Sequence, residues 1–292
     1  MNIVTSGLLL IDKPLGDTSR QALFSVQKII NSGRLGHTGT LDPLATGLLV
    51  LLCGQARKLQ NILTLDNKEY DVTVSLGAVS ETDDSEGPIH TNDDAVAPGL
   101  EEVKEMIGKF TGEIDQVPPR YSAIKIKGKR AYKSAREGEI IAIPSRKVRI
   151  DKIDLIDYNY PSLTLKVKCG SGTYIRSLAR DIGEGLGVGG YVRKLRRTQV
   201  GDFRIEDSST INEISIQSML RLEDVAVRYQ RIDLNNEYLI RICNGQKIAQ
   251  PQILEKDFRF PTFLWIDNRV IAIAKISDGV VSSRKLLIDN TF

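Results

Sequence analysis

The sequence predicts an α+β protein with a mixed, mostly antiparallel sheet, flanking helices and a small β-rich C-terminal module. Segments of strand-like and helix-like periodicity follow one another irregularly, without the regular alternation of parallel α/β proteins. The chain has 292 residues, 41% of them hydrophobic, so it is long enough to bury a large core and a second, smaller one. Residues 229–292 contain short β-like pieces. We therefore expect a catalytic-size domain over 1–228 and a module over 229–292.

The N-terminal part begins with a buried strand, a capped helix and a loop. Residues 7–11 are apolar, and Thr18 and Gln21 have the spacing of a capping box. The helix that follows has one apolar stripe and stops at residues 31–33. A loop rich in Gly and Thr then runs to Pro43 and leads into a predicted central strand.

The rest of the chain adds strands, two helices and an acidic turn. Helices are expected around 100–110 and over 174–182, because apolar residues recur there at helical spacing. The segment 208–229 also looks helical, with one polar side, and 81–87 reads as an acidic turn. Further strands are expected at 46–53, 70–76, 148–155, 163–169, 263–266 and 270–276.

Composition excludes several kinds of site. The three cysteines are widely separated, and the two histidines stand in unrelated surroundings, so we expect no disulfide framework and no metal site. The glycine pattern from Gly185 to Gly190 follows a helix, not a strand, which indicates a helix stop and no nucleotide cofactor. No apolar run is long enough to cross a bilayer, and the N-terminus lacks a signal peptide. We expect a cytoplasmic protein, monomeric by default.

Charge is segregated along the chain despite a formal net charge of only +3. Residues 66–118 are strongly acidic, whereas 120–149 carry ten basic residues against two acidic ones. A second basic run follows at 193–204. Two such runs can neutralise several phosphates, which indicates a nucleic-acid partner. The alternative, on composition alone, is two solvated faces that happen to be basic.

The stretch from Gly36 to Gly47, GHTGTLDPLATG, is the most informative part of the chain. Its glycines permit unusual backbone conformations, and Pro43 restricts the residue before it, so Asp42 can be held in one pose. Leu41 and Leu44 supply apolar bulk that shields the carboxylate. A fixed, shielded carboxylate suits chemistry at an anomeric carbon. The alternative is a turn aspartate that bonds its own backbone.

This stretch closely resembles the catalytic signature of the TruB family of tRNA pseudouridine-55 synthases. The resemblance implies that Asp42 is the catalytic aspartate and that His37 lies near the extruded nucleotide. Asp12-Lys13-Pro14 resembles the N-terminal motif of the family, in which the lysine supports the active-site loop, and we count Lys13 among the substrate-binding candidates.

Two more motifs match the family in the right order. Lys68-Glu69-Tyr70 resembles the strand that carries the active-site tyrosine, so Tyr70 is expected to stack on the base. The motif from Ser171 to Arg176 implies that Arg176 pairs with Asp42 and that Tyr174 contacts the substrate. The alternatives are core packing for Tyr70 and a surface pair with Asp181 or Glu184 for Arg176. Asp84 falls on a supporting aspartate, although Ser80 and Glu81 depart from the commoner Thr and Asp.

The basic stretch resembles the family's mobile insertion, about 119–146, which folds over RNA. Its substrate-binding candidates are Arg120, Lys125, Lys129 and Arg130. The C-terminal module weakly resembles the family's RNA-binding PUA module.

The resemblance implies a cofactor-free and metal-free isomerisation of one uridine in the T-stem-loop of tRNA, with the base flipped out of the loop. Asp42 either attacks the sugar or acts through a glycal. Two rivals are a non-catalytic RNA-binding or RNA-folding protein on the same scaffold, and an N-glycosidase of nucleosides.

Overall fold

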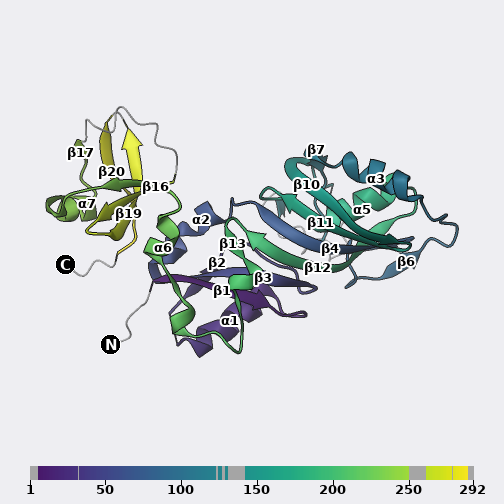
Figure 1. Ribbon diagram of the computed structural model, residues 1–292, viewed down its shortest axis with the longest axis horizontal. Coiled ribbons are helices and arrows are strands. Elements are labelled where there is room, and N and C mark those ends of the chain that lie inside the picture. The colour runs from purple at the N-terminus through teal and green to yellow at the C-terminus, as the bar shows by residue number, and fades with distance from the viewer. Residues whose placement is uncertain are drawn as a thin grey trace.

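The computed structural model describes residues 6–31, 33–122, 124–126, 129–130, 142–249, 261–277 and 279–288. It confirms the predicted α+β fold. The described residues form one sheet of 11 strands, a second sheet of 5 strands and two small two-stranded pairs. The second sheet lies at one end of the molecule, as Figure 1 shows, and contains the last strands of the chain.

The large sheet is mixed and mostly antiparallel, as expected. Its strands are β1 Gly7–Lys13, β2 Leu35–His37, β3 Ala45–Cys53, β4 Lys68–Leu76, β7 Gly112–Gln116, β10 Arg146–Asn159, β11 Ser162–Cys169, β12 Gly190–Val200, β13 Phe203–Arg204, β14 Ser209–Thr210 and β15 Leu220–Arg221. The order is β14-β1-β3-β12-β4-β11-β10-β7. Only β1 with β14 and β3 with β12 pair in parallel among these described strands.

In β3 and β4, at the middle of the sheet, the observed burial matches the apolar pattern of the sequence. β3 is buried along almost its whole length, as its continuous apolar run predicts. β4 alternates fully buried with partly buried residues, and its inward side chains, Tyr70, Val72 and Val74, join the main hydrophobic cluster. The loop that contains Asp42 leads directly into β3, so that loop is anchored at the most buried part of the sheet.

Helices pack beside this sheet. α1 Ser19–Ile29 begins at the Thr18 capping box that the sequence predicts, and α3 Leu100–Gly108 also forms where expected. α5 Ile175–Gly185 has Tyr174 as its N-cap and buries one face against β12. The remaining helical segments are η1 Gly54–Leu59, α2 Gln60–Leu63, η2 Ile205–Asp207, η3 Ile216–Ser218, α6 Leu222–Ala226, η4 Asn236–Tyr238 and α7 Leu239–Cys243.

The acidic turn of residues 81–87 connects two short paired strands, β5 Ala78–Ser80 and β6 Ile89–Thr91. After α5, the glycine pattern is a helix stop, as predicted. Gly187 and Gly189 adopt φ values of +74° and +80°, which a residue with a side chain rarely does. In the basic stretch, the backbones of β8 Lys125–Ile126 and β9 Lys129–Arg130 pair with each other.

Two expectations about local structure were wrong. The segment 208–229 is not one helix, because β14 and β15 pair with β1 and only α6 is α-helical. Pairing with a strand edge overrode the helix-like spacing of its apolar residues. Residues 190–200, taken from sequence only as part of a basic run, form β12, which lies between β3 and β4. Consecutive basic residues obscured the strand pattern there.

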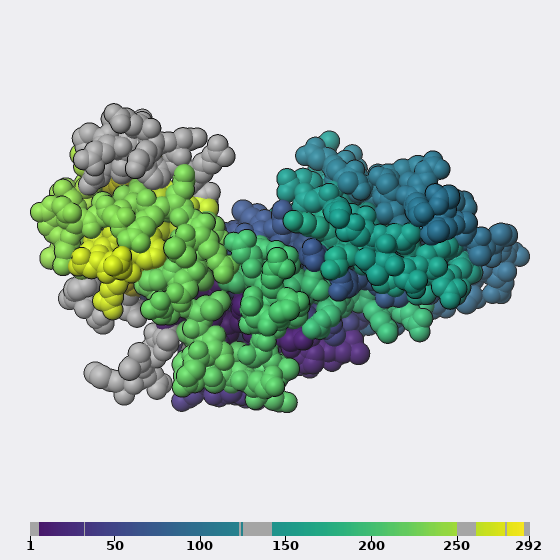
Figure 2. Space-filling model, in the orientation of Figure 1, coloured from purple at the N-terminus to yellow at the C-terminus, as the bar shows by residue number. Residues whose placement is uncertain are grey.

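The C-terminal sheet has the order β16-β18-β19-β20-β17. Its strands are β16 Gln230–Asp233, β17 Ile248–Ala249, β18 Thr262–Ile266, β19 Arg269–Ser277 and β20 Val280–Leu286. It has a hydrophobic cluster of its own, but side chains such as Phe263 and Trp265 also share a cluster with Leu8 and Leu48 of the large sheet. The C-terminal part and the region of residues 100–170 stand on either side of a wide indentation (Figure 2).

Candidate active site

The loop that carries Asp42 is fixed by contacts to the N-terminal part of the chain. The Ser19 hydroxyl accepts from Leu41 N at 2.7 Å and donates to Leu41 O at 3.0 Å. Lys13, whose side chain is fully buried, donates from Nζ to Pro43 O at 3.5 Å as well as to carbonyls of its own turn. Asp42 therefore sits between two anchored residues, which gives its carboxylate a defined position.

A cavity of about 730 Å³ opens beside Asp42. Its wall is formed by the Asp42 loop, β4, the acidic turn, residues 170–176 and β12. Five of the residues singled out from the sequence line it together: Asp42, Tyr70, Asp84, Tyr174 and Arg176. These five residues come from four segments that lie far apart in the sequence, so the fold assembles the site.

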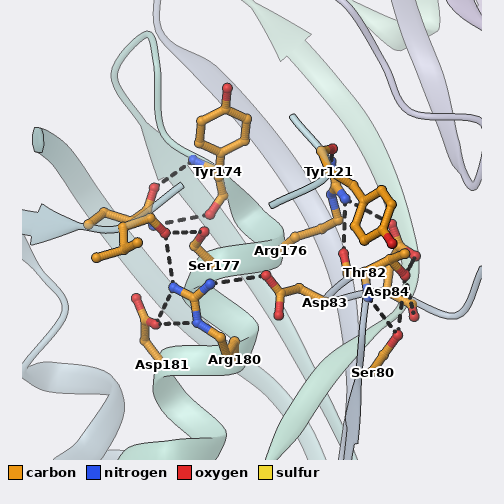
Figure 3. A network of polar contacts seen from close by, with 12 residues as sticks. Ser80, Thr82, Asp83, Asp84, Tyr121, Tyr174, Arg176, Ser177, Arg180 and Asp181 are labelled. Carbon is orange, nitrogen blue, oxygen red and sulfur yellow. Dashed lines mark hydrogen bonds and ion pairs between the residues drawn. The ribbon is translucent and has the colours of Figure 1, made fainter. Parts of the chain in front are cut away.

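Arg176 is the centre of the acidic side of the cavity. Its Nε lies 2.9 Å from Asp42 Oδ2, and its Nη1 lies 3.3 Å from Asp84 Oδ2. Nη1 also donates to Thr82 O at 2.9 Å and Nη2 to Tyr121 O at 3.0 Å (Figure 3). The contact with Asp42 is an ion pair without the alignment of a hydrogen bond. The guanidinium is thus held by two carbonyls while it faces two carboxylates.

The alternative reading of Arg176, as a surface partner of Asp181 or Glu184, is wrong. The neighbouring arginine of α5, Arg180, takes that role, with Nη2 2.7 Å from Asp181 and Nη1 3.0 Å from Asp83 (Figure 3). Arg180 thereby ties the acidic turn to α5 and leaves Arg176 for the cavity.

The electrostatic setting of Asp42 combines two opposing effects. Burial raises the pKa of its carboxyl, Arg176 lowers it, and the nearby Asp84 carboxylate raises it. The net shift is upward, so the arginine offsets burial only in part. The side chain keeps 37% of its surface exposed, and it does so as part of the cavity wall. The shielding expected from Leu41 and Leu44 is therefore incomplete, although both leucines are themselves buried.

Asp84 is held as a supporting group despite the departures at Ser80 and Glu81. It is only 2% exposed and accepts from the Thr82 hydroxyl at 2.5 Å and from Glu86 N at 3.0 Å. Ser80 lies within hydrogen-bond distance of the same hydroxyl, at 3.2 Å. The unusual serine thus still contributes to the network that positions the aspartate.

Tyr70 packs in the core, as the alternative interpretation expected, and it also reaches the cavity. It belongs to the main hydrophobic cluster, and it also lines the cavity. Burial raises the pKa of its phenol, while the positive charge of Arg197 lowers it. Tyr174 caps α5, exchanges backbone hydrogen bonds with the Gln116 amide, and lies under the guanidinium of Arg146 at 4.7 Å from the ring centroid.

The other residues predicted to bind substrate do not line the cavity, or their side chains lie outside the described part of the structure. His37, on β2, is not among the described residues that line it, and burial lowers the pKa of its imidazole. Lys13 supports the loop from behind and lines a separate cavity on the other side of it. Arg120 is exposed and also outside the lining. The side chains of Lys125, Lys129 and Arg130 lie outside the described residues.

The sequence-based prediction missed two buried cations in the cavity wall, Lys68 and Arg197, and also the partly buried Arg146. Lys68 stands two residues before Tyr70 on the same strand face, a signal that was available. Arg197 was assigned to a basic run of the surface, which was wrong, since it is only 2% exposed. Its neighbour Arg196 is also partly neutralised, because it pairs with Asp12 at 2.6 Å. The run at 193–204 is therefore not a continuous phosphate-binding surface.

Within the described part of the chain, no three His, Cys, Asp or Glu side chains gather closely enough to hold a metal ion. Over the same residues, no helix has the length and apolar character needed to cross a membrane.

The chain is similar to a family of known proteins. The model of the "TruB family pseudouridylate synthase (N terminal domain)" matches residues 27–175, and that of the "tRNA pseudouridylate synthase B C-terminal domain" matches residues 176–241. Proteins called tRNA pseudouridine synthase B are similar over most of their length. The one from Mycobacterium avium is 43% identical, with 83% of this chain and 81% of the relative aligned. For Azoarcus sp. the identity is 35%, with 99% and 97% aligned.

Solved structures show the same fold at lower identity. The Cbf5-Nop10-Gar1 complex contains a chain with a TM-score of 0.72 and 21% identity, covering 98% of this chain and 86% of that one. The archaeal box H/ACA sRNP Nop10-Cbf5 complex gives a TM-score of 0.71 at 20% identity, covering 99% and 88%.

Proposed function

Since the chain belongs to the TruB family of pseudouridylate synthases, we propose that it isomerises one uridine of the tRNA T loop, at position 55. The enzyme is an isomerase that forms pseudouridine in RNA. The observation that carries the finer proposal is the ion pair of Asp42 with Arg176 in the wall of a cavity that Tyr70 also lines. A cavity of about 730 Å³ has room for a flipped nucleotide, which matches the need to reach a base that a folded loop buries.

In the proposed reaction the bond between C1′ of the ribose and N1 of uracil breaks, and its electron pair stays on the base. Asp42 either bonds to C1′ or removes a proton from the sugar to give a glycal. The base then turns within the cavity. It bonds to C1′ through C5 either as the Asp42–C1′ bond breaks or, from the glycal, as the removed proton returns to the sugar. The proton of C5 is lost and N1 gains one, so no atom is added overall. Arg176 orients Asp42 and favours its ionised form, and Tyr70 packs on the base.

We assign the RNA partner as the T-stem-loop of tRNA. Arg120, Lys125, Lys129 and Arg130 belong to the basic stretch that would contact its phosphates, and Tyr174 with Asp84 would contact the nucleotide. His37 would lie beside the extruded nucleotide, one residue before Thr38 of the cavity wall, and Lys13 would act through the loop. We also propose a catalytic domain over 1–228, a PUA-like module over 229–292, a monomeric state, and action in the cytoplasm, where tRNA is found.

The test uses purified protein and an unmodified tRNA transcript, with pseudouridine mapped chemically along the RNA. We expect product at one T-loop position with wild-type protein. Asp42→Asn should fold and bind the transcript but give no detectable product, because an amide neither attacks C1′ nor accepts a proton effectively. Asp154→Asn, at a half-exposed aspartate paired with Lys152, is the matched control and should remain active. Full activity of the Asp42 variant would refute its assignment.

The same experiment separates the rival function. A non-catalytic RNA-binding or RNA-folding protein would bind the transcript equally well in wild-type and Asp42→Asn forms and would leave no pseudouridine in either. Product elsewhere than in the T loop would keep the family activity and overturn the proposed position.

A further inference from the structure

Two buried cations lie in the cavity wall without a role in the mechanism above. Arg197, on β12, is 2% exposed, and Lys68, at the start of β4, is 8% exposed. Both line the cavity. Lys and Arg side chains are seldom this buried unless a carboxylate compensates their charge.

Among the described residues neither cation forms an ion pair with a carboxylate, although the Asp66 carboxylate acts on Lys68 from farther away. Arg197 donates from Nε to Leu48 O at 2.7 Å and from Nη2 to Gly39 O at 3.2 Å. Lys68 donates from Nζ to Thr64 O at 2.6 Å and to Asp66 O. All four acceptors are backbone carbonyls, which satisfy the donors but do not neutralise the charges. The two positive charges are therefore available to an anion inside the cavity.

Their position relative to Tyr70 defines where that anion would be. Arg197 stands directly opposite Tyr70 in the register of β12 with β4, and Lys68 shares the inward face of β4 with Tyr70. Asp42 also acts on the Tyr70 phenol, as Arg197 does. The carboxylates of Asp42 and Asp84 pair with Arg176 and not with Lys68 or Arg197. A base that stacks on Tyr70 would therefore lie close to the Asp42 carboxylate and to both cations.

We propose that Lys68 and Arg197 form a cationic wall that stabilises the negative charge on the uracil base once its glycosidic bond is broken. The inference rests on the proposed function. When the C1′–N1 bond breaks, the base keeps the electron pair, and the charge spreads over N1 and the two carbonyl oxygens. This holds for both the nucleophilic and the glycal route. Fixed positive groups in the cavity wall stabilise such a charge without reorganising, which lowers the barrier to cleavage.

A phosphate of the RNA backbone is the other anion that two cations would attract. Stabilisation of the detached base and binding of a phosphate differ in how the effect of removing a cation depends on the base that leaves C1′. Fluorine at C5 withdraws electrons and stabilises the detached base, so a cleavage step assisted by cations should need them less with 5-fluorouridine. A phosphate contact would be indifferent to that fluorine, and its loss would weaken RNA binding instead.

The experiment compares single-turnover rates on two transcripts, one with uridine and one with 5-fluorouridine at the target position, measured as consumption of the target nucleoside. Lys68→Met removes the charge and keeps the chain length, and Lys68→Arg keeps the charge. Lys166→Met is the matched control, because this lysine lies on the neighbouring β11, outside the cavity lining, with 42% of its side chain exposed. Thermal unfolding and RNA-binding curves are recorded for every variant.

We expect Lys68→Met to lower the single-turnover rate about tenfold or more with uridine. With 5-fluorouridine the factor by which the rate falls should be smaller by at least about threefold. Lys166→Met should stay close to wild type on both transcripts, and Lys68→Arg should recover most of the rate that Lys68→Met loses. An equal loss on both transcripts, or weaker RNA binding alone, would overturn the proposal in favour of a structural or phosphate-binding role. If the methionine variant does not fold, Lys68→Gln, which can still donate to one carbonyl, gives the same comparison. Wild-type protein without any product would instead refute the proposed function itself.

Discussion

Replacing Arg176 tests how strongly the acidic side of the cavity depends on one guanidinium. In Arg176→Met the carboxylate of Asp84, which is 2% exposed, loses its only cationic partner among the described residues. It keeps hydrogen bonds from the Thr82 hydroxyl and from Glu86 N. Breaking a buried pair from one side typically costs about 3–5 kcal/mol, because a buried charge is left uncompensated. The pair with Asp42 adds little, since that carboxylate is 37% exposed and water screens it.

Arg176→Lys is the matched variant. It keeps the positive charge but not the planar fork that reaches Thr82 O, Tyr121 O and two carboxylates together. Losing one or two hydrogen bonds from a charged donor should cost about 1–3 kcal/mol. Urea unfolding followed by fluorescence measures both free-energy changes, and pseudouridine formation is assayed on the same samples. We expect the order of stability to be wild type, then lysine, then methionine.

Equal urea midpoints for wild type and Arg176→Met would refute this reasoning. They would mean that water reaches Asp84 and that Arg176 does not compensate a buried charge. If Arg176→Lys had normal stability but a large loss of activity, the main role of the Arg176 guanidinium would instead be to orient Asp42.

Three other predictions follow from the site. In Gly47→Ala, a methyl group would lie 2.3 Å from Arg197 O at a backbone φ of +103°, so we expect a loss of about 2–4 kcal/mol in unfolding free energy, seen in urea melts. Because burial raises the pKa of Asp42, kcat/KM should fall as pH decreases through that raised value. Arg176→Met removes the charge that lowers this pKa, so the fall in kcat/KM should shift to higher pH. An acid limb at the wild-type pH would contradict the pairing. Desolvation and then Arg197 lower the pKa of Lys68 to about 8, so kcat/KM should also fall as pH rises through about 8, and Lys68→Arg should abolish that alkaline limb. The groups facing Lys68 are Arg197, Asp66 and Cys169.

The sequence predicted the parts of the fold in which local pattern and tertiary role agree. The Thr18 capping box, the buried run of β3 and the alternation of β4 each report their own environment. The pattern failed for β12, where consecutive basic residues include one buried side chain and several exposed ones. Nothing in a single sequence tells which arginine of Arg196 and Arg197 points into the protein, because that is set by pairing with β3 and β4.

The candidate site was predicted unevenly for a similar reason. Motif resemblance singled out Asp42 and Arg176, which the fold brings within 2.9 Å of each other. It also grouped His37 and Lys13 with the substrate-binding residues, although neither is among the described residues that line the cavity. A motif records which residues occur together, but not whether a side chain points to the cavity or to the backbone that supports it. The buried donor contacts of Lys13 are set by the turn at Pro14 to Asp17, which only the folded chain displays.

The apolar cluster shared by the two sheets has a consequence for how the enzyme reaches its RNA. Phe263 and Trp265 of the C-terminal sheet pack with Leu8 of β1 and with Leu48 of β3, the strand that follows the Asp42 loop. Lys58 adds a polar link, donating from Nζ to Leu286 O at 2.6 Å. Side-chain packing therefore joins the C-terminal sheet directly to the strand that anchors Asp42. If the proposed function holds, an RNA bound by both parts would meet Asp42 at a span set by this packing.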